Sequence, residues 1–62
     1  MEKIEKLASR IYQEEKSKHA KPYQILSAMG KRLFDEYGVR DIEADTRYLY
    51  VSNVKVFDIK AV

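Results

Sequence analysis

Cysteine is absent from this chain of 62 residues, and glycine, proline and histidine are scarce, at two, one and one copies. Without cysteine the protein forms neither a disulfide nor a thiolate metal site. The single histidine, His19, also argues against a zinc site built on imidazole ligands. We therefore expect no metal and no cofactor, and a small core without covalent reinforcement.

Long apolar runs are also missing. A transmembrane helix needs about 20 predominantly apolar residues in succession, and every uncharged run in this chain is much shorter. The first ten residues, MEKIEKLASR, alternate charged with apolar side chains and lack the apolar region of a signal peptide. The chain is therefore predicted to be cytoplasmic and to make no use of a membrane.

Signatures of catalysis are weak. His19 is flanked by lysines and has no nucleophile at a suggestive spacing. The GKR run at 30–32 lacks the earlier glycine of a phosphate-binding loop, because Ile25 occupies that position. These observations predict a protein that is not an enzyme.

Acidic residues alternate at the start of the second half. Asp41, Glu43 and Asp45 fall on the same side of an extended segment, where carboxylates can hold a divalent cation. A solvated strand face is the favoured interpretation, since the predicted pairing places Lys60 opposite Asp45. Three hypotheses for function are considered: nucleic-acid binding, docking on another protein, and a metal-dependent enzyme. The metal-dependent enzyme is the weakest of them.

The first half of the chain has the periodicity of two helices. Residues 2–18 and 22–37 carry apolar side chains three and four residues apart. Pro22 suits the first turn of the second helix, and Gly38 suits the position that ends it. The predicted core residues of the two helices are Ile4, Leu7, Ala8, Ile11 and Tyr12, then Ile25, Leu26, Met29, Leu33 and Tyr37.

The second half is rich in β-branched and aromatic residues and predicts strands at about 41–51 and 54–61. Ser52-Asn53 serves as a two-residue turn, which would place Val51 opposite Val54 and Leu49 opposite Val56. A third helix over 40–51 is the alternative. The chain as a whole, residues 1–62, is predicted to be a single α+β domain. Its two-helix hairpin would pack on a C-terminal antiparallel β-hairpin or three-stranded meander.

The predicted hairpin is apolar on both faces. The face expected to pack on the helices carries Ala44, Thr46, Tyr48, Tyr50, Phe57, Ile59 and Ala61. The other face carries Leu49, Val51, Val54 and Val56, and nothing else in the chain is expected to cover them. An exposed aliphatic patch of this kind predicts an interface, with a second copy of the chain or with another protein. The alternative is that the hairpin tip covers itself against the helices.

Basic residues carry the leading hypothesis for function, although the net charge is only +2. Lys3, Lys6 and Arg10 form one stripe on the first helix. We expect a small, non-enzymatic regulatory protein that binds DNA or RNA weakly as a homodimer, through phosphate contacts. The residues predicted to bind are Lys3, Lys6, Arg10, Lys18, Lys21, Lys31 and Arg32. Two alternatives stay open: a protein-interaction module or inhibitor that docks through the four aliphatic residues, and an ordinary solvated charged surface.

Overall fold

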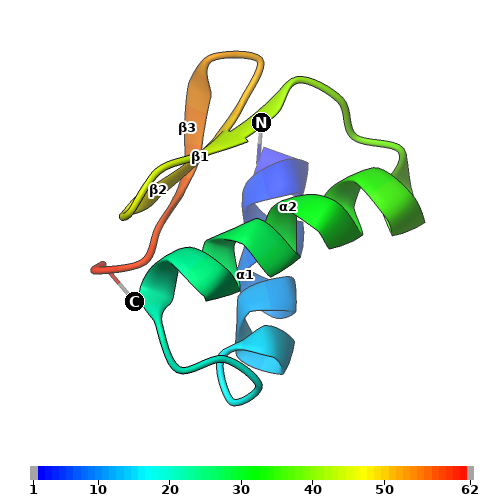
Figure 1. Ribbon diagram of the computed structural model, residues 1–62. Coiled ribbons are helices and arrows are strands. Elements are labelled where there is room, and N and C mark those ends of the chain that lie inside the picture. The colour runs from blue at the N-terminus through cyan, green and yellow to red at the C-terminus, as the bar shows by residue number, and fades with distance from the viewer. Residues whose placement is uncertain (1, 62) are drawn as a thin grey trace.

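Two helices followed by a three-stranded sheet make up the computed structural model, which describes residues 2–61 with the exception of the Glu2 side chain (Figure 1). The elements are α1 (Glu2–Glu15), α2 (Pro22–Tyr37), β1 (Ile42–Ala44), β2 (Tyr48–Val51) and β3 (Val54–Asp58). The sheet is antiparallel in the order β1-β2-β3, and it packs on the helix pair, in which α2 crosses α1. The predicted α+β fold is confirmed in its meander form. Within the described residues, no helix has the length and apolar content that a bilayer span requires.

The boundaries of α2 are those predicted. Pro22 lies in its first turn, and Gly38 follows its last residue with a φ of 68°, a conformation that glycine adopts without strain. The amide groups of Gly38 and Val39 donate hydrogen bonds of 3.1 and 3.0 Å to the carbonyl oxygens of Phe34 and Leu33. These bonds satisfy carbonyls that the end of the helix leaves without partners.

Helix α1 is shorter than predicted, because it ends at Glu15 and residues 16–18 form a turn. The three residues in question, Lys16, Ser17 and Lys18, are all exposed. A helical turn that buries no apolar side chain gains nothing from tertiary packing, and packing supplies most of the stability of a short helix.

The prediction of one long strand over 41–51 is wrong, because the chain reverses its direction between β1 and β2. The Asp45 carboxylate accepts hydrogen bonds from the amide groups of Arg47 and Tyr48, at 2.8 and 2.7 Å. An aspartate that bonds to the backbone two and three residues further on stabilises a turn. Asp45 therefore separates β1 from β2, and it does not pair with Lys60 as predicted. Strand β3 likewise ends at Asp58 rather than at residue 61.

The turn at Ser52-Asn53 is confirmed, with φ values of 52° and 65° at its two residues. The register beyond it is only partly as predicted. Val51 pairs with Val54, but an irregularity between Leu49 and Tyr50 places Leu49 opposite Phe57 instead of Val56. One extra residue in β3 thus shifts every later pair by one position, as a β-bulge does.

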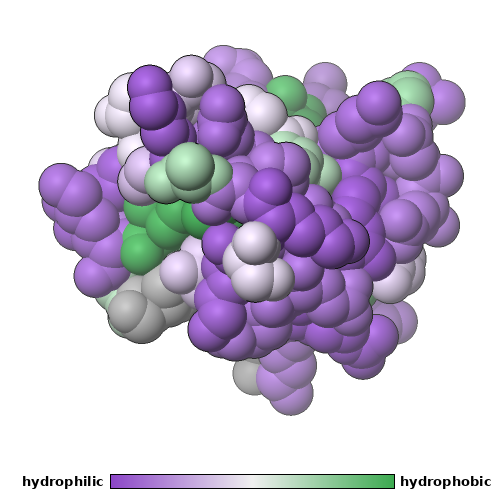
Figure 2. All heavy atoms as spheres, turned by 60° about the horizontal axis from the view of Figure 1, so that its bottom comes forward, coloured by the Kyte–Doolittle hydropathy of each residue, from purple (hydrophilic) through white to green (hydrophobic). Residues whose placement is uncertain are grey.

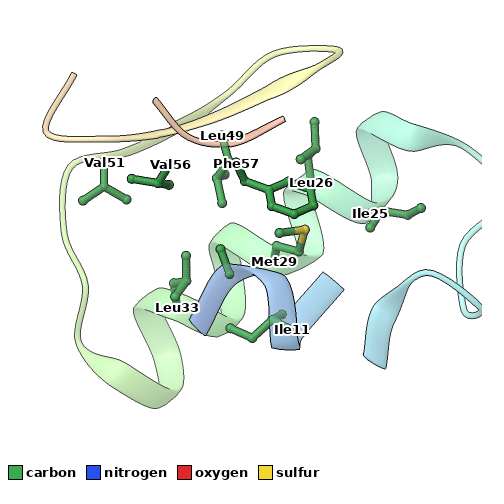
Figure 3. Close-up of a cluster of buried hydrophobic side chains, with 10 residues drawn as sticks. Ile11, Ile25, Leu26, Met29, Leu33, Leu49, Val51, Val56 and Phe57 are labelled. Carbon is green, nitrogen blue, oxygen red and sulfur yellow. The ribbon is translucent and has the colours of Figure 1, made fainter. Parts of the chain in front are cut away.

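The face predicted to be uncovered is the face that packs on the helices. Leu49, Val51 and Val56 retain 0, 3 and 5% of their accessible surface, and only Val54, at the hairpin tip, is exposed, at 47%. Figure 3 shows Leu49, Val51 and Val56 in one cluster with side chains of both helices. The aliphatic interface inferred from the sequence is therefore mostly hydrophobic core. The alternative, that the hairpin tip covers itself against the helices, holds for Leu49, Val51 and Val56 but not for Val54.

The opposite face of the sheet carries Tyr48 and Tyr50, which are half-buried. The cationic groups of Arg47 and Lys55 lie 4.9 and 4.1 Å from the centre of the Tyr48 ring. The Tyr50 hydroxyl donates a hydrogen bond of 3.4 Å to Asp45. Tyrosine keeps its hydroxyl satisfied more readily at a surface than in a core, and leucine and valine have no such requirement. The aliphatic face therefore takes the interior position.

Truncation of Leu49 tests this assignment of faces. We expect Leu49→Ala to lower the free energy of unfolding by about 2–5 kcal/mol, or to abolish cooperative unfolding, since a buried leucine leaves a cavity. Val54→Ala, a truncation on the same strand pair at an exposed position, should change it by no more than about 0.5 kcal/mol. Urea denaturation followed by circular dichroism measures both. Equal small effects would mean that Leu49 faces solvent.

Candidate nucleic-acid interface

Three of the seven cations predicted to bind nucleic acid lie together. Lys3, Lys6 and Arg10 are exposed on one edge of α1 and line a shared groove of about 530 Å³. Their spacing of three and four residues keeps them on the same side of the helix. The groove lies between the N-terminal half of α1 and the chain where α2 ends, and its remaining lining is Ile4, Leu7, Tyr37 and Val39.

The floor of this groove is apolar. Ile4, Leu7 and Val39 are half-buried and pack against the core, so their positions are fixed by the fold. Tyr37 is the last residue of α2, and 44% of its surface is exposed. The sequence pattern placed Tyr37 in the core and did not indicate the groove, because α1 and the end of α2 are brought together only by tertiary packing.

The charges on the rim are uncompensated by the side chains that the structure describes. No carboxylate among the described side chains lies within 4.0 Å of the cationic groups of Lys3, Lys6 or Arg10. Glu14 stands four residues after Arg10, a spacing at which the two could pair. The Glu14 carboxylate is instead bound to Arg32, 2.6 Å away. Arg10 is thereby left available for an external anion.

Arg32 itself is held by three carboxylates. Its guanidinium donates to Glu36 at 3.0 and 3.1 Å, and to Glu14 and Glu15 at 2.6 and 3.3 Å. Hydrogen bonds to Glu36 and then Glu14 raise the pKa of Arg32. A phosphate that bound Arg32 would have to displace these partners, so Arg32 does not belong to the candidate interface. Its evident role is to join α2 to the end of α1.

The other predicted cations lie elsewhere. Lys18 contacts Glu15 at 3.5 Å, and Lys21 is exposed just before α2. Lys31 lines a second hollow, between α2 and β1. Figure 2 shows the end of the molecule that holds the connection from α1 to α2, where the surface is mainly hydrophilic and the hydrophobic colour appears only in a few small, separate areas. The seven cations therefore form no single continuous surface.

The predicted acidic cluster does not assemble as a metal site. Among the described side chains, which exclude that of Glu2, no three of His, Cys, Asp or Glu are grouped so that they could hold a metal ion. Asp41 has a φ of 57° and lies outside the strands, and Asp45 is occupied by its turn. Of the three carboxylates only Glu43 lies in a strand, β1, so the three do not share one side of an extended segment. His19 contacts a carboxylate oxygen of Glu15 at 3.0 Å.

Comparison of the chain with protein families, with curated proteins and with solved structures finds no match. The residues of the groove and the charges around it are therefore the basis for assigning a function.

Glu15 forms a charged cluster with His19, Lys18 and Arg32, and the contribution of this cluster to stability depends on pH. The hydrogen bond with His19, followed by the charges of Lys18 and Arg32, lowers the pKa of Glu15 below its ordinary value of 4.5. A carboxyl with a lowered folded-state pKa stabilises the fold above its unfolded pKa, and this contribution is lost as the pH falls through the folded value. We expect Glu15→Gln to reduce the loss of thermal stability between neutral and acidic pH.

Melting temperatures measured from neutral pH to below the ordinary carboxyl range provide the test. Glu5→Gln is the matched control, because Glu5 is exposed on the same helix and makes no ion pair with a described side chain. This variant should keep the pH dependence of the original protein. A Glu15→Gln protein with the same dependence would contradict the stabilising role of the cluster. The dependence should shrink rather than vanish, because the pKa is also lowered at Glu36, Asp45 and Asp58.

Proposed function

We propose that this protein is a non-enzymatic binding protein that contacts the phosphates of a nucleic acid through Lys3, Lys6 and Arg10. The observation that carries the proposal is the row of three exposed cations on one edge of α1, none of them paired with a described carboxylate. Cations already neutralised within a protein, such as Arg32, gain little from a phosphate. Cations without partners release counterions from the nucleic acid and gain affinity.

The length of the row suits a polyanion. Lys3 and Arg10 are seven residues apart, which corresponds to about 10 Å along a helix axis. One strand of B-DNA carries a phosphate for every ~3.4 Å of its axis. The row therefore extends over about three phosphates. With so few contacts and a net charge of +2, binding should be weak and sensitive to salt.

The proposal uses a single copy of the chain in the cytoplasm. A homodimer through the hairpin was inferred from Leu49, Val51 and Val56, and those side chains lie in the core of the monomer. A homodimer thus stays a prediction, and the residues from which it was inferred are not available to form its interface. The same burial removes the aliphatic docking face from the alternative function, so we do not propose that version of a protein-interaction module.

Charge reversal tests the proposal. We expect Lys6→Glu combined with Arg10→Glu to weaken binding at low salt at least about tenfold. It should also make the dependence of log K on log salt shallower, by about 0.7–0.9 for each phosphate that the variant no longer neutralises. Fluorescence anisotropy of labelled oligonucleotides, offered as single strands and as duplexes, measures both quantities.

The matched control is Lys16→Glu combined with Lys60→Glu, two exposed lysines outside the groove. It changes the net charge by the same amount and should affect binding much less. An equal loss in both double variants would show that the total charge acts, and not the row on α1. If the original protein binds neither form of oligonucleotide at low salt, the proposed function is wrong.

A further inference from the structure

The groove beside the three cations has a floor that phosphates cannot use. Ile4, Leu7 and Val39 offer only hydrocarbon, and Tyr37 adds a half-exposed aromatic ring. A phosphate gains nothing from such contacts and is better placed in water. The ligand that fits this site must therefore carry negative charge on one side and a flat or apolar group on the other.

The two kinds of surface are also separated in space. All three cations of the lining belong to α1, whereas the opposite wall is formed by Tyr37 and Val39, which carry no charge. A strand that ran along α1 would place its phosphates on the cations and its bases towards Tyr37. Single-stranded nucleic acid is bound in this way elsewhere in proteins, through a basic groove with aromatic rings on which bases stack.

A duplex does not satisfy this groove. Its bases are paired and stacked within the helix, and turning one of them outward costs a few kcal/mol. In a single strand the bases are already accessible, so the cost is small. The groove volume of about 530 Å³ lies within the range of about 300–1,000 Å³ that is usual for ligand sites.

Two other surfaces are less suited to binding a base. The hollow between α2 and β1 contains a single cation, Lys31, together with the acidic Asp41. On the outer sheet face the Tyr48 ring is already occupied by Arg47 and Lys55. Neither surface combines an exposed aromatic ring with several cations that lack a described carboxylate partner, whereas the groove of α1 does.

We infer that the ligand of this groove is single-stranded nucleic acid, with its phosphates on Lys3, Lys6 and Arg10 and one base against Tyr37. The inference rests on the proposed function and narrows it, because a protein could bind phosphates through the same cations without using the groove floor.

The test compares a labelled single strand of about 12 nucleotides, within the usual site size, with the duplex of the same sequence. We expect the single strand to bind at least about tenfold more tightly at equal salt. Tyr37→Ala should weaken single-strand binding by about 5- to 150-fold, the effect of losing one stacked base. It should leave duplex binding within about twofold, and Tyr37→Phe should retain single-strand affinity.

Tyr23→Ala is the matched control, since Tyr23 is on the same helix, is 48% exposed and lies outside the groove. It should bind the single strand as the original protein does. Should Tyr37→Ala fail to fold, the original protein can be titrated with the single strand and followed by NMR. This titration shows whether the strand lies in the groove. The methyl signals of Ile4, Leu7 and Val39 should shift, and that of the buried Leu49 should not.

Each other outcome has a definite meaning. Duplex binding as tight as single-strand binding, and unaffected by Tyr37→Ala, would overturn the inference while leaving the proposed function standing. The absence of binding to both would overturn the two together. An acidic peptide of alternating Glu and Leu serves as a second probe. If this peptide bound and lost affinity in Tyr37→Ala while the single strand did not bind, the groove would be a protein-docking site and the inference would be wrong.

Discussion

The stability of this molecule, the positions of its ionic groups and the groove of α1 all depend on the contact between the aliphatic face of the sheet and the two helices. No disulfide reinforces the chain, so its stability must come from one small core. Leu49 has no accessible surface and lies over α2, where Gly30 permits a close approach. A Cβ atom at position 30 would stand only 3.1 Å from Cγ2 of Ile42 and 3.8 Å from Cδ1 of Leu49. The lack of a side chain at this point in α2 allows β1 and β2 to pack directly on the helix.

This packing also determines where the ionic groups lie. With the sheet on one side, the helices cross and bring Glu14 and Glu15 of α1 to Arg32 of α2. The acidic residues that follow Arg10 on α1 are engaged there, and the basic row nearer the N-terminus has no described carboxylate partner. A chain with nearly equal numbers of acidic and basic residues thus presents a local cationic edge. Local charge of this kind matters more for binding than the net charge does.

The groove of α1 arises from the same geometry. Because α2 ends at Tyr37 and the left-handed Gly38 redirects the chain, Tyr37 and Val39 come to lie beside Leu7. Apolar side chains that belong to the edge of the core become the floor of a surface hollow. The proposed role of this hollow depends on its combination with the basic row, since an apolar hollow without neighbouring charge would not distinguish a nucleic acid from any other ligand.

Local sequence was sufficient for the features that depend on neighbouring residues. The 3.6-residue periodicity, Pro22 and Gly38 define α2, and Ser52-Asn53 defines the hairpin turn, because these signals act through the backbone conformation of a few residues. The basic row on α1 also followed from helical spacing alone. Only the tertiary structure decided which sheet face is buried, because one extra residue in β3 changes the pairing and both faces were apolar. It also decided that Arg32 is bound by Glu14 and Glu15 and that Tyr37 lines a groove with residues of α1. These neighbours are many residues away in the chain, so a local sequence pattern does not indicate the contacts.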